Sequence, residues 1–279
     1  MDGNITKIRR QLKSIKSTKK LTNAMSLVAT AKLQKERGRL LDNNNYAALL
    51  EDLLYTALCA KTEGPESNGF LIKSNIDNPL HIVFTSNSGL CGAYNIELLK
   101  FVEKNIGKDE PIFAVGSYGI KWLMNNNYMV VKQITDLNDI NPLVINRLIS
   151  NIMTLYVNNE ISSIDVFYTD YINTLKQEPK VHKLLPFDFT DKQLVERDIL
   201  LEPSRDEILN ELIPMYISSQ IYEKFLESNI SENAARRMAM NGADQNAENL
   251  IDKLQIKYNQ ARQASITQEM NEISAGSLK

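Results

Sequence analysis

The stretch SENAARRMAMNGADQNAENLIDKLQIKYNQARQASITQEMNEIS, residues 231–274, lies near the end of the chain and decides the fold. It is rich in residues that favour helix, contains no proline and has one glycine, Gly242. We expect one helix from about Asp206 to Ser274. At about 1.5 Å per residue it would be about 100 Å long, too long to be buried in its own domain. A second long element must lie beside it.

The start of the chain supplies that element. Apolar residues follow the three- and four-residue steps of a coiled-coil seam at Ile5, Ile8, Leu12 and Ile15. The same frame continues through smaller or polar residues at Lys19, Thr22, Ser26 and Ala29. A second stripe, displaced from the first, consists of Leu21, Met25 and Val28, and from it we expect a shift in the packing register.

The C-terminal helix has a seam of its own with smaller residues towards the end of the chain. Its members are Ala247, Leu250, Leu254, Tyr258, Ala261 and Ser265. Two long helices from opposite ends of one chain predict an antiparallel pair. Because their seams stay exposed in isolation, we expect the chain alone to be elongated and only marginally stable.

Between the two helices the pattern alternates between strands and helices. Strands are predicted at 80–85, 112–117 and 128–135, each followed by an amphipathic helix, and two antiparallel strands at 164–173 and 180–187. The predicted fold is mixed: a long antiparallel coiled coil of the terminal helices, with an inserted α/β, Rossmann-like domain that has a mainly parallel sheet. The predicted divisions are helix 1–61, linker 62–78, α/β domain 79–195, linker 196–206 and helix 207–276.

Composition excludes several classes of protein. Hydrophobic residues make up 43% of the 279, enough for a core, so the chain is not disordered. The formal net charge of -2 gives no overall reason to expect nucleic acid. No apolar run approaches the roughly 20 residues of a membrane span, and the first residues lack a signal-peptide core. Two cysteines are too few for a disulfide scaffold and favour a reducing compartment.

The residues that carry reactive chemistry give no convincing active site. Cys91 lies in the glycine turn SNSGLCGAYN, which could be a nucleophile elbow or a phosphate cradle, but the turn has neither a phosphate-binding lysine nor a dinucleotide spacing. The histidines, His81 and His182, each fall inside a predicted strand. We therefore interpret the turn as structural and expect no catalytic residue, no metal site and no cofactor.

The first helix carries a strong local charge. Between Gly3 and Lys35 there is no acidic residue but a run of basic ones: Lys7, Arg9, Arg10, Lys13, Lys16, Lys19, Lys20, Lys32 and Lys35. One interpretation is nucleic-acid binding, although no aromatic residue precedes Tyr46 to stack on bases. The other is a coiled coil that touches an acidic protein loop. The residues alone leave both open.

Three stretches, taken in order, resemble the hallmark segments of the gamma subunits of F-type ATP synthases. They are KIRRQLKSIKSTKKLTNAMSLVATAKLQK near the start, TSNSGLCGAYN in the centre, and SENAARRMAMNGADQNAENLIDKLQIKYNQARQASITQEMNEISAG at the end. The resemblance implies a non-catalytic subunit without cofactor: the central shaft of a rotary motor that couples proton flow to ATP synthesis or hydrolysis. It also implies partners, namely three alpha and three beta subunits, the epsilon subunit and the ring of c subunits.

The resemblance also implies which residues touch those partners. Met25, with Lys19 and Lys20, matches the bearing against an acidic loop of the beta subunit, and Arg236 matches a position across the coiled coil from Met25. Near the tip the matching residues are Arg262, Gln263 and Thr267. Glu202 resembles a glutamate at the foot of the shaft, which faces the c ring and epsilon, although a solvated loop carboxylate is an equal alternative.

The family resemblance places the chain at the periphery of a membrane. We expect the cytoplasmic face of the bacterial inner membrane or, for a processed organellar protein, the matrix or stromal face. Two alternatives to the shaft remain: a free-standing basic coiled-coil adaptor or nucleic-acid binder, and a cysteine hydrolase that depends on Cys91.

Overall fold

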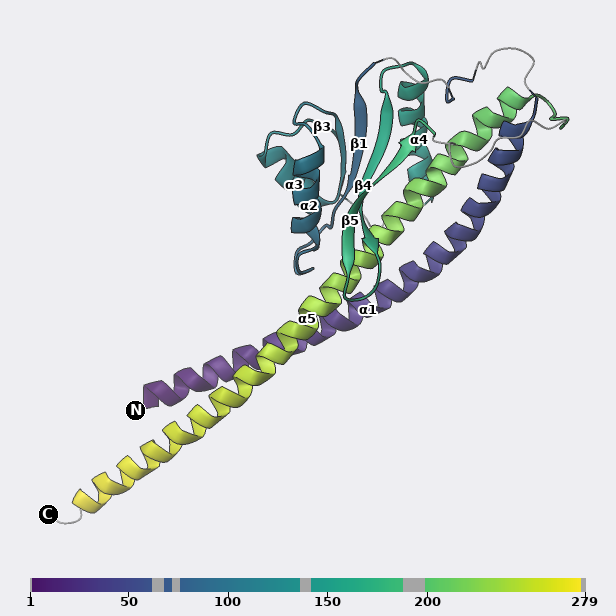
Figure 1. Ribbon diagram of the computed structural model, residues 1–279. Coiled ribbons are helices and arrows are strands. Elements are labelled where there is room, and N and C mark those ends of the chain that lie inside the picture. Colours follow the sequence, from purple (N-terminus) through teal and green to yellow (C-terminus); the bar gives the residue numbers. More distant parts are fainter. Residues whose placement is uncertain (1, 62–67, 72–75, 136–141, 188–198, 277–279) are drawn as a thin grey trace. The chain divides into compact units, whose positions relative to one another are not determined.

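The computed structural model describes residues 2–61, 68–71, 76–135, 142–187 and 199–276. Two long helices carry the ends of the chain, α1 (Asp2–Cys59) and α5 (Arg205–Gly276). Residues between them form an α/β domain (Figure 1). The mixed fold with long terminal helices and an inserted, mainly parallel sheet is therefore confirmed. The predicted domain boundaries remain a prediction.

The domain contains one five-stranded sheet in the order β3-β2-β1-β4-β5. The strands are β1 (Pro79–Phe84), β2 (Ile112–Val115), β3 (Val130–Ile134), β4 (Ser163–Tyr171) and β5 (Gln177–Leu185). The first four run parallel, and β5 returns antiparallel to β4, as the two successive strand patterns predicted. The connecting helices are α2 (Tyr94–Asn105), α3 (Ser117–Asn125) and α4 (Pro142–Val157).

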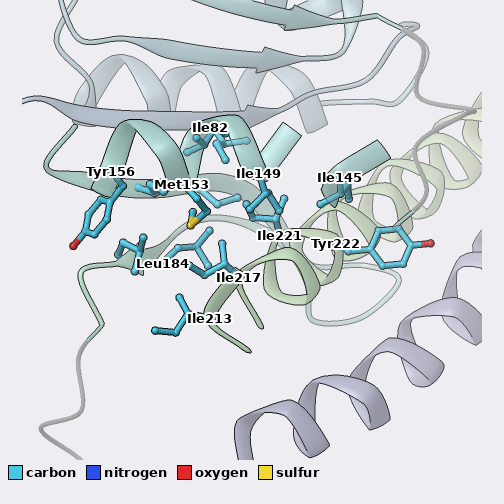
Figure 2. Close-up of a cluster of buried hydrophobic side chains, with 14 of the residues drawn as sticks. Ile82, Ile145, Ile149, Met153, Tyr156, Leu184, Ile213, Ile217, Ile221 and Tyr222 are labelled. Atoms are coloured by element: carbon cyan, nitrogen blue, oxygen red, sulfur yellow. The ribbon is translucent and has the colours of Figure 1, made fainter. Parts of the chain in front are cut away.

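Alternate residues of the strands build two apolar cores, one on each face of the sheet. Ile82 and Phe84 pack on one face with the buried sides of α4 and α5, whereas Val83 packs on the other with residues of α2 and α3. Figure 2 shows the first core, where Ile149 of α4 lies close to Ile217 and Ile221 of α5. The start of α5 is therefore part of the domain core.

Contacts divide the chain into two compact units. The first consists of residues 1–30 and 236–279, and the second of residues 31–235. Each long helix therefore contributes to both units. In the first unit Lys19 contacts Glu248 and Ser26 contacts Asn241, so the numbers rise along α1 as they fall along α5. The two helices are antiparallel there, as predicted.

The expected register shift in the first unit is wrong. In the original frame Thr22 and Ala29 are buried and Ser26 is half-buried, whereas Leu21 is 61% exposed and Val28 is also exposed. Polar seam residues can stay inside because they find partners: Thr22 Oγ1 donates to the carbonyl of Lys19 (3.0 Å). Ser26 Oγ donates to Asn241 Oδ1 (2.6 Å). Leu21 and Val28 therefore form part of the surface.

One position of the expected C-terminal seam is also wrong. Leu250 is exposed, and the neighbouring Ile251 is half-buried in its place. From Ala247 the inward residues follow steps of four and three, through Ile251, Leu254, Tyr258, Ala261 and Ser265. Both Leu250 and Ile251 are apolar, so only the phase of the seam decides between them.

Candidate functional site

The two lysines of the proposed bearing in α1, Lys19 and Lys20, differ in their contacts and exposure. Lys19 Nζ lies 3.0 Å from Glu248 Oε1, and this hydrogen bond to Glu248 raises the pKa of Lys19. Lys20 is exposed on the helix surface. Of the two lysines, Lys19 therefore already has a partner within the chain, and Lys20 presents its charge outward.

Met25 and Arg236 belong to the same compact unit. Met25 is half-buried and Arg236 is 9% exposed. The Ser26–Asn241 hydrogen bond sets the local register of the antiparallel pair. By that register Arg236 lies about 9 Å along the axis from the level of Met25, since each helical residue rises about 1.5 Å. The two residues are on facing helices but not at the same level.

The three tip residues all lie on the surface of α5. Arg262, Gln263 and Thr267 are exposed, and the hydroxyl of Thr267 donates to the carbonyl of Gln263 (2.9 Å). Between them Ser265 is buried in the seam. Arg262 and Gln263 therefore present charge and amide groups outward, whereas the hydroxyl proton of Thr267 is bound to its own helix.

Glu202 lies in the second unit, just before α5. It is exposed and precedes a cis bond to Pro203. Two hydrogen bonds fix the start of α5. Ser204 Oγ accepts from the Glu207 amide (3.2 Å), and Arg205 Nε donates to the carbonyl of Ala57 in α1 (3.1 Å). Glu202 is therefore a surface carboxylate beside an anchored helix start.

In the glycine turn after β1, Cys91 contacts a hydroxyl and an amide group. Cys91 is buried, Asn95 Nδ2 donates to its sulfur (3.2 Å), and the same amide donates to Ser86 Oγ (2.6 Å). Leu90 and Gly92 have positive φ angles of 62° and 59°. These partners are amide and hydroxyl groups rather than a catalytic base. The turn is thus built as a hydrogen-bonded structural connection.

His81 has a setting that the sequence patterns did not predict. Its Nε2 lies 2.7 Å from Glu110 Oε2, and its Nδ1 lies 3.6 Å from Asp165 Oδ2. Burial raises the pKa of Asp165. The signal lies in the sheet register, because His81 stands directly opposite Asp165 across β1 and β4. Among the described residues, no group of three or more possible ligands is placed to hold a metal ion.

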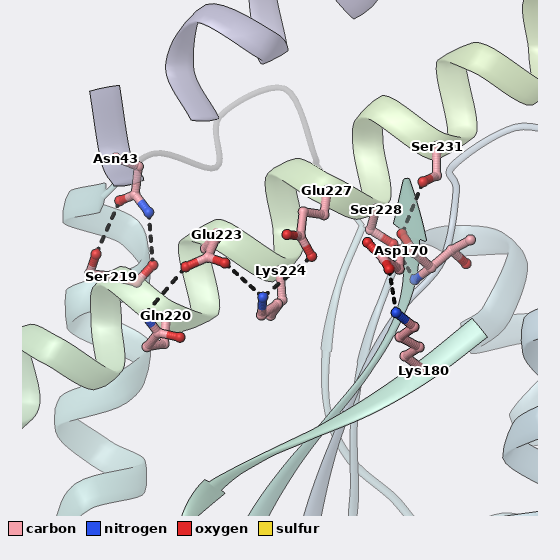
Figure 3. Close-up of polar contacts among 11 residues, drawn as sticks. Asn43, Asp170, Lys180, Ser219, Gln220, Glu223, Lys224, Glu227, Ser228 and Ser231 are labelled. Carbon is pink, nitrogen blue, oxygen red and sulfur yellow. Dashed lines mark hydrogen bonds and ion pairs between the residues drawn. The ribbon is translucent and has the colours of Figure 1, made fainter. Parts of the chain in front are cut away.

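A second missed group lies on α5. Lys224 is buried, and its Nζ lies 2.7 Å from Glu223 Oε1 and 3.4 Å from Glu227 Oε2 (Figure 3). It also lies 5.2 Å from the ring centroid of Tyr168 in β4. Burial raises the pKa of Glu227. The sequence signal is the charged EKFLE at 223–227 in an otherwise apolar part of the helix.

No described helix combines the length and the apolar character that a bilayer crossing requires.

The profile of the ATP synthase family matches residues 4–278, almost the whole chain. The chain therefore belongs to the ATP synthase family.

Within that family the chain is similar to proteins named ATP synthase gamma chain. It is 36% identical to that of Mycoplasma mycoides subsp. mycoides SC over 98% of each chain. It is 33% identical to that of Clostridium botulinum, covering 98% of this chain and 97% of the relative. The resemblance to gamma subunits that three sequence stretches indicated is confirmed.

Solved structures with the same fold come from rotary complexes. One is a chain of the Euglena gracilis mitochondrial ATP synthase (OSCP/F1/c-ring), with TM-score 0.72 and 20% identity, covering 99% of this chain and 94% of that one. Another is a chain of the Tetrahymena thermophila mitochondrial ATP synthase (central stalk and c-ring), with TM-score 0.60, 24% identity, and coverage of 80% and 99%.

Proposed function

We propose that this chain is the central rotor shaft of an F-type ATP synthase. It transmits torque from the proton-driven c ring to the catalytic ring of alpha and beta subunits and so couples proton flow to ATP synthesis or hydrolysis. The observation that carries the proposal is the match to gamma chains over nearly the full length of both proteins.

The chemistry of the paired ends supports a rotating contact. The described seam near the tip uses small or weakly polar residues such as Ala261 and Ser265, while charge and amide groups face outward. Such a surface can contact an enclosing protein ring without inserting a large side chain into a pocket of the ring, which would hold the two in one position. A rod that presents a different face to each catalytic subunit favours a different nucleotide state in each of them.

The subunit itself carries out no bond-making step in this proposal. The beta subunits hold the nucleotides, and the chain acts by its position. Support comes from the glycine turn, in which Cys91 is buried among amide and hydroxyl groups.

Specific contacts follow from the exposed site residues. Lys20, with Met25 and the Lys19–Glu248 pair beside it, forms the bearing against an acidic loop of beta. Arg262 and Gln263 contact the catalytic ring near the tip. Glu202 contributes to the foot, where the c ring and epsilon bind. Arg236 contributes mainly from within the helix pair, since it is buried there.

The assembled complex sits at a membrane, with this chain at its periphery. The bacterial relatives from Mycoplasma and Clostridium support the cytoplasmic face of the inner (plasma) membrane. The alternative is the matrix or stromal face of an organelle.

Reconstitution tests the proposal. The chain is mixed with purified alpha and beta subunits, and complex size and ATP hydrolysis are followed together. We expect a complex of three alpha, three beta and one copy of this chain, with turnover that falls when the chain is truncated before Arg262. A chain truncated after Met270 is the matched control and should retain more turnover.

The opposite outcome has a clear meaning. If the chain stays separate and hydrolysis is indifferent to it, the shaft function is wrong. Salt-sensitive retention of the separate chain on nucleic acid would then favour the basic adaptor.

A further inference from the structure

The order of the strands indicates where an open α/β sheet is expected to bind a ligand, at the carboxyl ends of β1 and β4. From β1 the chain moves through β2 to β3 on one side, and then returns to place β4 on the other side of β1. The crossover direction therefore reverses between β1 and β4. In open α/β sheets ligands bind outside the carboxyl ends of the strands at such a reversal.

In this protein α5 lies at that position. Its Ser228 and Ser231 are 2% and 0% exposed. Ser228 Oγ lies 2.8 Å from the hydroxyl of Tyr94, the first residue of α2, and accepts a longer bond (3.4 Å) from the amide of Thr169 in β4. Ser231 Oγ donates to the carbonyl of Thr169 (3.0 Å; Figure 3). We call these four residues the serine clasp.

The sheet itself explains why Thr169 offers its main-chain groups to a helix. Across β5 it stands opposite Pro179, which has no N–H, so the two residues cannot exchange hydrogen bonds. The amide and carbonyl of Thr169 therefore face β1. The pairing of β1 with β4 ends at Val83 and Phe167, before it reaches Thr169. Without the two serines these buried groups would lack partners, which is costly.

The serine clasp supplies directionality that the apolar core does not. Ile217 and Ile221 pack α5 against the sheet and α4, but apolar burial is non-directional and resists sliding weakly. Hydrogen bonds depend on both distance and angle, so the clasp fixes the axial position and rotation of the helix. On the adjoining turns Lys224 pairs with Glu223 and Glu227. Its ammonium group also lies over the ring of Tyr168, the residue before Thr169 in β4.

We propose that α5 occupies the ligand crevice of the α/β domain as a built-in ligand, and that Ser228 and Ser231 are positioning residues that let the domain pass torque to the helix. The second half of this inference rests on the proposed shaft function. The first half concerns the chain alone.

Hydrogen exchange on the isolated full-length chain tests the crevice. In the double variant S228A/S231A the Thr169 amide should exchange at least about tenfold faster than in wild type, while the amide of Val166 stays unchanged. Thr169→Val is the matched control, because the Thr169 hydroxyl has no hydrogen-bond partner among the described residues. Equal exchange at position 169 in wild type and the double variant would overturn the assignment of α5 to the crevice.

Loaded and unloaded turnover test the torque role in the complete membrane-bound complex. With S228A/S231A, ATP synthesis against a proton gradient should fall at least about threefold, while hydrolysis with an uncoupler changes by less than about a fifth. A purely structural defect lowers both rates together, and that outcome, like unchanged synthesis, would overturn the torque role.

A variant that does not assemble is replaced by Tyr94→Phe and Ser228→Ala singly, which remove opposite ends of the same 2.8 Å bond. Both should lower the ratio of loaded to unloaded turnover, and an unchanged ratio in both again overturns the role. If the wild-type chain itself fails to support synthesis, the shaft function fails, and the exchange experiment still decides the crevice.

Discussion

The same two helices pack in different ways in the two compact units. In residues 31–235 the α5 side chains that point inward are large, and Leu209, Ile213, Ile217 and Leu226 are fully buried. In the unit made of residues 1–30 and 236–279, the inward residues of α5 beyond the buried Met240 are small or only half-buried, and Leu250 and Ile256 face solvent. The first kind of packing provides stability, and the second leaves surface for partners.

The largest expected difference comes from truncating matched isoleucines in the two units. Ile217→Ala removes a side chain with 0% exposure and should lower the free energy of unfolding by about 2–4 kcal/mol. Ile256→Ala, at a position that is 59% exposed, should change it by less than about 0.5 kcal/mol. Urea denaturation measures both, and similar losses would show that the two units do not differ in packing.

Buried and exposed polar contacts between α1 and α5 give the next effect. In the larger unit Asn43 Nδ2 donates to the carbonyl of Ser219 (3.1 Å), and Ser219 Oγ donates to Asn43 Oδ1 (3.3 Å). Asn43→Ala should cost about 1–2 kcal/mol, because the buried Ser219 hydroxyl loses its acceptor and the Ser219 carbonyl loses its side-chain donor. Ser26→Ala, which removes the more exposed bond to Asn241, should cost clearly less. The same urea titration ranks them, and the reverse order would contradict this account.

A smaller, pH-dependent effect should be confined to the larger unit. Burial, and then the charge of Lys224, lower the pKa of His182 below its ordinary value of 6.5. The folded state therefore binds this proton less readily than the unfolded chain. The contribution of neutral His182 to the free energy of unfolding is thus fully present above pH 6.5, and it is lost as the pH falls through the pKa of the folded state. His182→Gln should flatten this part of the urea midpoint profile between pH 5 and 8. A variant profile parallel to wild type would rule out the histidine as its origin.

The smallest effect should come from the ion pair of the paired ends. Lys19 and Glu248 keep side-chain exposures of 30% and 60%, and water and salt screen such a pair. Glu248→Gln should leave the melting temperature almost unchanged at low salt and fully unchanged at high salt. A large, salt-independent decrease would mean that this unit depends on the pair for its folding.

Much of the fold could be predicted because its signals are local. The absence of proline after Pro214 predicted the continuous helix, and the strand and helix patterns predicted the parallel sheet and its antiparallel β5. The seam register could not be predicted in the same way. Whether Ser26 or Val28 turns inward depends on Asn241, which lies 215 residues away and accepts the serine's hydrogen bond.

The site was predictable only in part, for a related reason. Family motifs indicate surface residues such as Lys20 and Arg262, which remain proposed contacts. The setting of His81 depends on sheet register, and that of Ser228 on the proline opposite Thr169, so neither follows from spacing along the chain. These contacts require the strands to be paired first.

The two edge strands bear on how newly made copies of the chain behave before their partners arrive. A bare sheet edge invites a foreign strand, and lysine or proline on that edge opposes such addition. The β5 edge carries Pro179, Lys180 and Lys183, and the short β3 edge has Lys132 at its centre. Both edges therefore disfavour self-association through the sheet. Aggregation of the free subunit should instead begin at exposed apolar residues of the helices, such as Leu21 and Val28.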